Sequence, residues 1–561
     1  MDVPTYRAAR GAVIAVVVGV IVAAPAATAT SKRLDSMKTI VRTGMDTRGR
    51  LRTLALALML GLVGAAPASA AGPSAGAAGL GDRLNPGIGN GGYDVQSYDL
   101  HLRYATADPG QALQGDETIV ARATQALSRF NLDFAGKSIG AVSVNGHAAA
   151  FKRTGEELIV TPAGPIDNGS TFTVRITAFT ATPTKITKAI HSTTFFVTPD
   201  GSATAPQPYD AHLIYPCNDH PSDKATFTFT IDVPAGRDAV ANGVETGHTT
   251  SNGRTIWTYR MAQPMATELT QIAVGDWDFG PTYDHGGVTV RDATAPAITA
   301  DVQPALALTG AQLDWMTARV GSYPFDSYGL LIVNAPLPLQ LETQSITLSR
   351  ADFFSGYPRA IWEPGMVHEL AHMWFGDSVS PSSWSDLWLN EGYATWYEFT
   401  YAEEAGQLAG DTEGYPDPQG YATLDDLMRA MYAHGDEWRK KSGPVAMPKS
   451  GDVLKLYSFQ VFHGGALVLY ALRQKIGASG FEEVARAWVE RYRGRSASTD
   501  DFVALATEVS ADQSVAPFLR DWLYGKKTPP MPGHPDWTVN PVGSITTSST
   551  EPVAGHRAWQ P

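Results

Sequence analysis

Two histidines and a glutamate carry the clearest chemical pattern of the chain, in the segment His368-Glu369-Leu370-Ala371-His372. If this segment is helical, the two imidazoles lie on one face and can bind one metal ion together. Glu369 can then lean toward the open coordination position and take a proton from a metal-bound water. We predict a helix here that Pro364 introduces and Gly376 closes.

A third ligand must come from another element, because two imidazoles are too few for such a metal site. Glu391 begins the next strongly apolar helix, and the 18 residues between it and His372 let the chain reverse direction. Two imidazoles, one carboxylate and an open position for water favour one tetrahedral zinc ion over other metals. Glu398 lies on the same helix face as Glu391, where it either orients a ligand imidazole or is a solvated carboxylate.

Composition indicates a globular protein with several domains and argues against a nucleic-acid partner. The chain has 561 residues, 43% of them hydrophobic and 18% charged, which is enough for two or more cores. Acidic residues outnumber basic ones by 56 to 43, whereas nucleic acids require clustered Lys and Arg. Cys217 is the only cysteine, so no intramolecular disulfide can form, and we predict a packed structural thiol rather than a nucleophile.

The N-terminal region carries two export signals in tandem. Residues 11–27 are apolar and follow two arginines, and residues 54–66 are apolar, follow three arginines and precede a small-residue cleavage pattern. Each resembles a signal peptide. Since one suffices, we interpret Met45 or Met37 as the true start and expect cleavage after Ala70, giving a secreted protein with no stable membrane association. The alternative is that residues 11–27 form a short membrane anchor.

The hydrophobic pattern changes along the mature chain. Short alternating runs such as Thr226 to Ile231, separated by Gly, Asn and Pro, predict antiparallel strands. Longer periodic stretches, including residues 366–375, 391–405 and 465–476, predict helices. We therefore expect a multidomain protein in which an N-terminal antiparallel β saddle or sandwich domain precedes an α+β, mostly helical domain. The expected divisions are residues 1–70 (signal region), 71–92 (flexible lead-in), 93–282 (β-domain), 283–532 (zinc-binding domain) and 533–561 (C-terminal tail).

Two segments together resemble the aminopeptidase N family of zinc metallopeptidases, a gluzincin family: His368 to Gly376 and Leu387 to Ala394. Tyr215 to Ala225 is similar to that family's N-terminal β-domain, so the likeness covers most of residues 93–537. The resemblance implies a saddle-like β-domain, a thermolysin-like catalytic domain, and a short secreted bacterial-type member without the large C-terminal helical domain. It also implies a zinc-dependent aminopeptidase that hydrolyses N-terminal residues from peptides.

The same resemblance assigns residues that would hold the substrate. Glu342 matches a glutamate that binds the free α-amine, and Gln207 matches a residue beside the same amine. Gln340 and Leu341 are expected to contact the substrate as well. Relatives usually have Gly or Ala where Leu339 and Gln340 stand, so the shape of the pocket for the first side chain stays open. Without the resemblance, Glu342 would be a surface or edge-strand carboxylate and Gln207 a surface amide.

One expected catalytic hydroxyl is missing. Val461 to Leu467 resembles a family segment whose tyrosine stabilises the oxyanion, but Phe462 occupies the tyrosine position. Loss of one such donor typically costs about 10²–10³ in rate. Tyr457 lies five residues earlier, which on a continuous helix points it about 140° away, so its help requires a local break. His463 is the other candidate donor, with an exposed histidine at a helix start as the simpler interpretation.

Three functions stay open on these residues. The first is a working aminopeptidase that acts on peptides with a free N-terminus. The second is a zinc-loaded pseudoenzyme that binds peptides with little turnover because of Phe462. The third is an endopeptidase that leaves Glu342 and Gln207 unused. We favour the aminopeptidase, because the three predicted ligands and Glu369 are all present.

Overall fold

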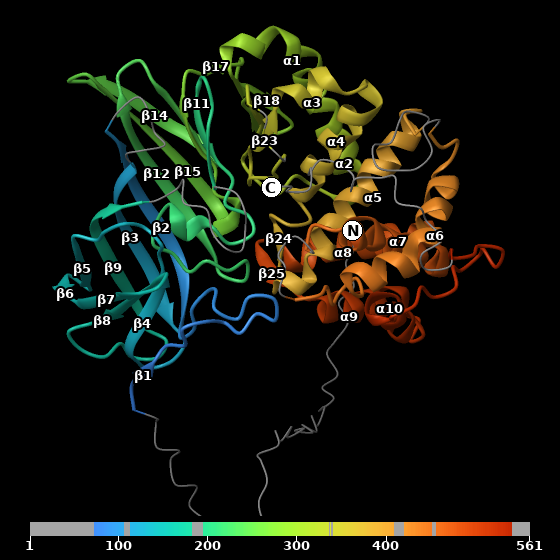
Figure 1. The fold of residues 1–561 in the computed structure, drawn as a ribbon, viewed down its shortest axis with the longest axis horizontal. Helices are drawn as coiled ribbons and strands as arrows, with labels where there is room; N and C mark the ends of the chain where they lie inside the picture. Colours follow the sequence, from blue (N-terminus) through green and yellow to red (C-terminus); the bar gives the residue numbers. More distant parts are fainter. Residues whose placement is uncertain are drawn as a thin grey trace, which may run out of the picture. The chain divides into compact units, whose positions relative to one another are not determined.

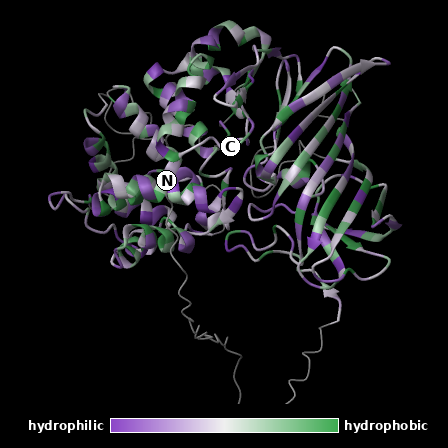
Figure 2. Cartoon of the chain, turned by 180° about the vertical axis from the view of Figure 1, so that it is seen from behind, coloured by the Kyte–Doolittle hydropathy of each residue, from purple (hydrophilic) through white to green (hydrophobic). Residues whose placement is uncertain are grey.

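Alternation of buried and half-exposed side chains organises the N-terminal part of the protein around one large sheet. In β12 (Lys224–Pro234), Phe227 and Phe229 face the core while Thr228 between them is partly exposed. Figure 2 shows the same alternation of hydrophobic and hydrophilic residues along the other long strands. The computed structural model describes residues 72–105, 113–181, 194–335, 337, 340–408, 420–450 and 456–540. The predicted signal region with Met37, Met45 and Ala70, and also Leu339, lie outside these residues.

The large sheet has eight strands in the order β14-β15-β12-β2-β3-β9-β5-β6 (Figure 1). Its neighbouring strands are antiparallel except for β12 and β2, which pair in parallel, so the sheet is mixed. The long connection between these two strands allows the chain to return in the same direction. The other bounds are β2 (Tyr93–Tyr104), β3 (Leu113–Ala123), β5 (Ala141–Val144), β6 (His147–Ala148), β9 (Thr171–Thr180), β14 (Val244–Ser251) and β15 (Arg254–Ala266).

Two four-stranded sheets complete the β-rich part, in the orders β1-β4-β8-β7 and β10-β11-β16-β13. The first consists of β1 (Ser74–Ala75), β4 (Leu127–Asp133), β7 (Ala150–Thr154) and β8 (Glu157–Thr161). The second consists of β10 (Phe195–Val197), β11 (Gly201–Thr204), β13 (Asp238–Ala241) and β16 (Ile272–Gly275). Cys217 is fully buried among these strands, which confirms the predicted packed thiol.

The segment before the β-domain is packed, which corrects the expectation of a flexible lead-in over 71–92. Strand β1 pairs in parallel with β4. Further along, the buried carboxylate of Asp82 accepts a hydrogen bond from the Trp384 backbone N–H at 2.8 Å. Arg83 donates to the Pro448 carbonyl at 2.7 Å. Composition failed to predict this order because the segment is fixed by partners distant in the sequence, two of them 302 and 365 residues away, and not by its own periodicity.

The second part mixes short strands with long helices. Its sheets have the orders β17-β20-β22-β23, β18-β19-β21 and β24-β25. Their strands are β17 (Asp278–Phe279), β18 (Tyr283–His285), β19 (Val288–Val290), β20 (Ala293–Thr294), β21 (Ser327–Tyr328), β22 (Leu330–Val333), β23 (Thr347–Arg350), β24 (Val379–Pro381) and β25 (Arg495–Ala497). All four residues of β22 are buried.

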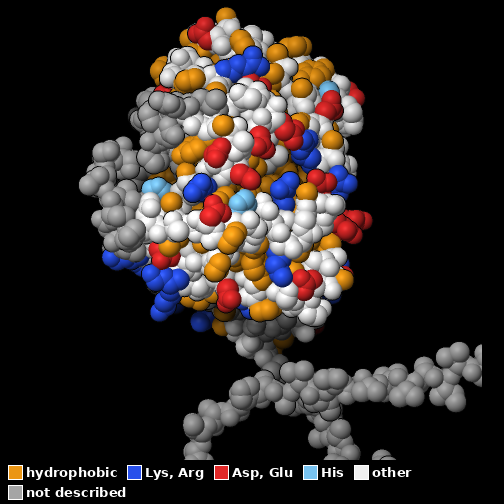
Figure 3. Space-filling view, turned by 90° about the vertical axis from the view of Figure 1, so that its right-hand side faces the viewer, with side chains coloured by type: hydrophobic (Ala, Val, Ile, Leu, Met, Phe, Trp, Pro, Cys, Tyr) orange, Lys and Arg blue, Asp and Glu red, His pale blue; other side chains and the backbone are white. Residues whose placement is uncertain are grey.

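Helices dominate the remainder of this part. They are α1 (Thr299–Leu306), α2 (Thr309–Val320), α3 (Ala351–Gly356), α4 (Arg359–His372), α5 (Trp388–Glu404), α6 (Leu424–Ser442), α7 (Phe459–Ile476), α8 (Ala478–Tyr492), α9 (Thr499–Ser510) and α10 (Val515–Tyr524). Figure 3 shows acidic and basic side chains interspersed over most of this face, with basic side chains gathered at its lower left edge. Among the residues that the structure covers, no helix is both long and apolar enough to span a membrane.

The beginning of the predicted C-terminal tail also packs on the helices. Trp537 is buried and stacks on Tyr470 of α7 with ring centroids 5.8 Å apart. The Asn540 backbone N–H donates to the Ala433 carbonyl in α6 at 2.8 Å. The expectation of a tail from residue 533 is therefore wrong for residues 533–540, and residues 541–561 lie outside the described part. The expected order of a β-rich domain followed by a mostly helical α+β domain is confirmed.

Candidate metal centre

Helix α4 carries three of the predicted site residues, His368, Glu369 and His372, on its last turns. It begins at Arg359, so Pro364 lies inside the helix and does not introduce it, which corrects the predicted start. The helix ends at His372, and the Asp377 backbone N–H donates to the His372 carbonyl at 2.9 Å as the chain turns away. All three site residues are buried, so they are not part of a solvent-exposed helix face.

Gly376 shapes the turn that follows α4. Its φ of +134° lies in a region that L side chains rarely adopt. A Cβ at this position would also come within 3.1 Å of Asn390 Nδ2 and 3.3 Å of His372 Nδ1. The glycine therefore lets the chain turn tightly between a metal-ligand candidate and helix α5.

Glu391 reaches the same place from α5. The next residue, Gly392, packs directly on the backbone of Gly465 in α7, and a Cβ on Gly392 would lie 2.9 Å from the Gly465 Cα. Two glycines thus let the helix backbones approach closely, as small residues do at helix crossings. This crossing fixes the first turn of α5, and with it Glu391, against both α4 and α7.

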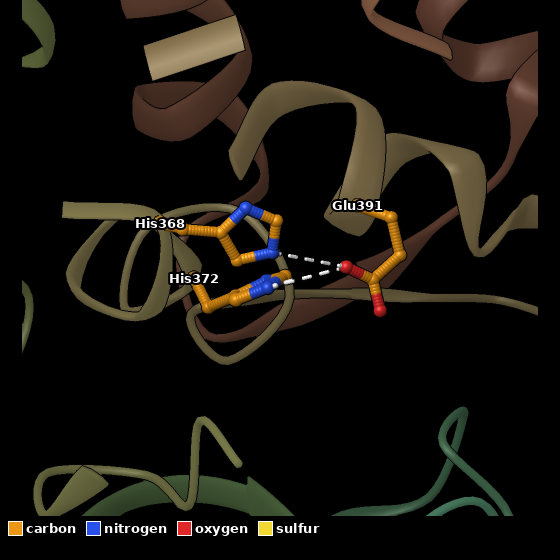
Figure 4. Close-up of side chains that lie close together, drawn as sticks. All are labelled: His368, His372 and Glu391. Carbon is orange, nitrogen blue, oxygen red and sulfur yellow. Dashed lines mark ion pairs between the residues drawn. The ribbon is translucent and has the colours of Figure 1, made fainter. Parts of the chain in front are cut away.

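The three predicted ligands converge. Glu391 Oε2 lies 3.4 Å from His368 Nε2 and 3.4 Å from His372 Nε2 (Figure 4). Ligand atoms about 2.1 Å from one tetrahedral ion would be about 3.4 Å apart, so the spacing fits zinc-sized coordination. Two imidazole nitrogens and one carboxylate oxygen are also the donor types of catalytic zinc sites. The residues present therefore fit one zinc ion.

The second nitrogen of each imidazole is engaged, which orients both rings. His368 Nδ1 lies 2.9 Å from Glu398 Oε2, and His372 Nδ1 lies 3.2 Å from the Phe375 carbonyl oxygen. With each Nδ1 as donor, Nε2 keeps its lone pair for a metal. The structure thus places Glu398 against the His368 imidazole. The alternative interpretation of Glu398 as a solvated carboxylate is therefore wrong.

Glu369 lies beside the ligands with its carboxylate open. It is 1% exposed, and neither of its carboxylate oxygens has a hydrogen-bond partner among the described residues. Ligand-type atoms of Glu369, His372 and Glu342 all lie within 4.8 Å of one another. Burial raises the pKa of Glu369 to about 8, although the neighbouring imidazoles act in the opposite direction. A buried carboxylate with free acceptor positions beside the ligands can take a proton from a water molecule.

The predicted amine-binding pair is also assembled. Gln207 Nε2 donates to Glu342 Oε1 at 2.7 Å, and the side chains are 7% and 0% exposed. The alternatives of a surface amide and a surface carboxylate are therefore wrong. Glu342 Oε2 has no hydrogen-bond partner in the part of the chain that the structure covers. This oxygen is thus available to a cationic group at the site.

The neighbours of Glu342 alternate across a short β-bridge between Leu341 and Leu348. Gln340 is on the same face as Glu342, and its Oε1 accepts a hydrogen bond from Ser349 at 2.8 Å. Gln340 Nε2 is buried and has no partner among the described residues. The side chain of Leu341 is on the opposite face, 1% exposed, and its predicted substrate contact stays a prediction.

The beginning of α7 forms the remaining side of the centre. The Phe462 ring stacks on the His368 imidazole with centroids 6.0 Å apart and an interplanar angle of 12°, so position 462 does face the metal ligands. Because α7 begins at Phe459, Tyr457 precedes the helix and the angle predicted for a continuous helix does not apply. His463 is 3% exposed, so the exposed alternative is wrong, and burial lowers its pKa to about 3.

One supporting residue was not predicted. Lys224, at the start of β12, donates through Nζ to the carbonyls of Asp377 and, at 3.0 Å, of Ser378. Both carbonyls belong to the turn that ends the metal-binding helix. Lys224 lies within the segment Tyr215 to Ala225, which resembles the family's β-domain, but that resemblance assigned the lysine no role.

Comparison with known proteins gives matches over both parts of the chain. The model of the Peptidase M1 N-terminal domain matches residues 95–269, and that of the Peptidase family M1 domain matches residues 362–522. Aminopeptidase N of Streptomyces lividans is 25% identical over 448 residues, covering 76% of this chain and 50% of that protein. Aminopeptidase M1 of Arabidopsis thaliana is 26% identical over 58% of this chain and 36% of its own length.

A solved structure of similar length matches as well. The M1 zinc metallopeptidase from Deinococcus radiodurans is 30% identical, with a TM-score of 0.68, over 81% of this chain and 98% of that chain. A mutant of that protein has been solved with a Tyr-Ser-Ala substrate bound. The present chain, by contrast, spans only about a third to a half of the length of the curated relatives described above.

Proposed function

Because the chain belongs to the peptidase M1 family, the aminopeptidase N family of zinc metallopeptidases, we propose that it is a secreted zinc-dependent aminopeptidase that releases N-terminal residues from peptides. The observation that carries the proposal is the Gln207–Glu342 hydrogen bond, which holds a buried carboxylate within 4.8 Å of Glu369 and His372. A carboxylate fixed this close to the ligands can bind the free α-amine of a peptide. The peptide bond after the first residue then lies at the metal centre.

The roles of the side chains follow from their positions. His368, His372 and Glu391 would hold one zinc ion, which supplies Lewis acidity to the attacking water and the substrate carbonyl when bound. Glu369 takes the proton of the attacking water and returns it to the leaving amine, because its carboxylate oxygens lie beside the ligands without a hydrogen-bond partner among the described residues. Glu398 and the Phe375 carbonyl keep the ligand imidazoles oriented.

Glu342 recognises the substrate by charge. Its Oε1 is held by Gln207, while Oε2 can accept a hydrogen bond from the α-ammonium group of the peptide. Charge-assisted hydrogen bonds of this kind are stronger than neutral ones. Gln340 Nε2, on the same face, can donate to a carbonyl of the peptide backbone. These contacts favour an exopeptidase over an endopeptidase.

A zinc-loaded pseudoenzyme is the second candidate, and one observation favours it. The ring that stacks on His368 belongs to a phenylalanine, so position 462 offers no hydroxyl to a developing oxyanion. This candidate predicts peptide binding with little turnover.

Hydrolysis of aminoacyl fluorogenic substrates by the purified protein separates these functions. The aminopeptidase predicts turnover that a chelator removes, that zinc restores and that Glu369→Gln abolishes. Equal inactivity of wild type and Glu369→Gln, with zinc bound in both, would instead support the pseudoenzyme. Free and N-acetylated peptides distinguish an exopeptidase from an endopeptidase, because acetylation removes the cation that Glu342 binds.

Secretion is proposed from the sequence of residues 1–70 alone. N-terminal sequencing of protein recovered from the medium tests it, with Ala71 as the expected first residue. A mature chain that begins before Met45 would contradict both the proposed start and the proposed cleavage.

A further inference from the structure

The residue before the first turn of α7 has a conformation that frees it from the helix. Ser458 is extended, with φ −105° and ψ 156°, and α7 begins only at Phe459. The backbone N–H groups of Val461 and Phe462 donate to the Ser458 carbonyl, so helical bonding starts there. Tyr457 therefore lies outside α7, and the angle between its side chain and that of Phe462 cannot be calculated from helical periodicity.

Two contacts fix this end of α7 at the metal centre. Phe462 stacks on the ligand imidazole of His368, and Gly465 touches the backbone of Gly392, next to the ligand Glu391. A residue two positions before Phe459 must consequently lie near the same centre, since neighbouring Cα atoms are only about 3.8 Å apart. The Tyr457 ring is half-buried, but its hydroxyl oxygen is shielded from solvent.

Two carboxylates of the proposed site act electrostatically on this hydroxyl. Burial, and after it the carboxylates of Glu342 and Glu391, raise the pKa of Tyr457 well above its usual value. One of these carboxylates is the proposed amine acceptor and the other a proposed metal ligand. A peptide whose amine binds Glu342 and whose scissile bond lies at the metal would have the carbonyl of its first residue between these two groups. The hydroxyl also stays protonated, and hence a donor, throughout the neutral pH range.

The other side chains of this wall cannot take the same role. Phe462 has no donor. The His463 ring stacks on Phe459, 5.1 Å away, and on Phe399, 5.8 Å away, and is neutral because burial lowers its pKa to about 3. The stacking contacts of His463 are with Phe459 and Phe399, whereas Phe462 is the residue that stacks on the His368 imidazole.

We infer that Tyr457 donates a hydrogen bond to the substrate carbonyl oxygen as negative charge develops on it, in place of the hydroxyl that Phe462 lacks. The inference rests on the proposed aminopeptidase function. No proton is transferred from the tyrosine, and the only new interaction is the O–H···O bond. A preorganised donor of this kind contributes mainly to the transition state, so it raises kcat rather than binding of the ground state.

Tyr457→Phe tests the inference. We expect kcat to fall about 10²–10³-fold, with KM within a few-fold of wild type and an unchanged zinc content. Phe462→Tyr alone should change kcat little, since a donor already serves, but it should restore part of the lost rate in the Tyr457→Phe background. Tyr283→Phe, at an exposed tyrosine of β18, is the matched control. A Tyr457→Phe enzyme with wild-type kcat would overturn the inference.

A binding measurement keeps this test independent of turnover. A phosphinic dipeptide analogue carries a tetrahedral oxyanion, so Tyr457→Phe should weaken its binding at least about tenfold while leaving the binding of a free amino acid unchanged. If wild type showed no chelator-sensitive turnover, the proposed function would fail while this difference could still appear. Equal affinity of both proteins for the analogue would refute the role of Tyr457 itself. Thermal unfolding of each variant verifies that it folds.

Discussion

Two groups of buried carboxylates, one in the β-domain and one at the metal centre, differ in how their oxygens are engaged. In the β-domain, Asp219 accepts hydrogen bonds from His212 Nδ1 and Thr267 Oγ1, both at 2.7 Å. Asp133 accepts from the Asp219 backbone N–H at 2.9 Å, and Asp223 in turn accepts from Asn218. These carboxylates accept hydrogen bonds from donors inside the domain, so they form a structural network.

At the metal centre the carboxylates are equally buried but differently engaged. Glu369 has no hydrogen-bond donor among the described residues, and Glu342 has one on a single oxygen. Both point toward His372, together with the ligand Glu391. Burial alone therefore does not identify a functional carboxylate. Convergence of open acceptors on two imidazoles does, because such an arrangement is stable only when cations balance it.

The largest expected effect is the loss of a metal ligand. Glu391→Ala removes the carboxylate that lies 3.4 Å from both ligand imidazoles. Since removal of a group that merely supports a ligand costs about 10–100-fold in metal affinity or activity, this change should cost at least 10²-fold. Zinc per chain after dialysis and kcat on an aminoacyl substrate should fall together. Full zinc occupancy in the variant would show that Glu391 is not a ligand.

The amine-binding carboxylate should rank next. Glu342→Gln replaces a charged acceptor by a neutral one, and a hydrogen bond to a charged group is worth about 1.5–3 kcal/mol, or roughly 10–10²-fold. We expect kcat/KM to fall by that factor for peptides with a free N-terminus and hardly at all for N-acetylated ones. Glu117→Gln, another buried carboxylate but in the β-domain, is the matched control and should leave kcat/KM unchanged.

The two sides of the site differed in how far the sequence could predict them. His368 and His372 are about one helical turn apart, so helical periodicity alone placed both imidazoles on one face, with Glu369 next to the first of them. Glu391 needed only one further helix. Gln207 and Glu342 come from different parts of the chain, and periodicity gives no information about such a pair. Only the family resemblance joined them, and the structure then supplied the 2.7 Å contact.

Tyr457 and Asp82 show why the remainder could not be predicted. The direction of Tyr457 depends on where α7 begins: the sequence predicted a helix over 465–476, α7 begins at Phe459, and helix starts are set by local hydrogen bonds. Asp82 is fixed by the Trp384 backbone, which no local composition reveals. The order of a β-domain followed by an α+β domain could be predicted, because the hydrophobic periodicity of each segment indicates strand or helix without knowledge of distant partners.

The structural network of the β-domain should affect stability and not catalysis. Asp219→Ala leaves donors of His212 and Thr267 without their acceptor, and each buried group left unsatisfied costs about 1–3 kcal/mol. Urea unfolding should therefore show a lower midpoint, while KM for an aminoacyl substrate stays near the wild-type value. A change in KM with unaltered stability would mean that this network belongs to the site after all.

Glu117 provides the sharpest form of the comparison, because it is a buried carboxylate without donors that does not belong to a site. It lies in β3, is 1% exposed, and neither carboxylate oxygen has a partner among the described residues. Burial raises the pKa of Glu117 well above its usual value. From about pH 4.5 upward, the unfolded chain releases this proton while the folded protein keeps it. The free energy of unfolding therefore falls with rising pH, by at most about 1.4 kcal/mol per pH unit from this group.

Glu117→Gln should remove this pH-dependent loss of stability. Its Tm should match wild type at pH 4.5 and exceed it increasingly toward pH 8, whereas parallel Tm curves would show that Glu117 is compensated in the folded protein.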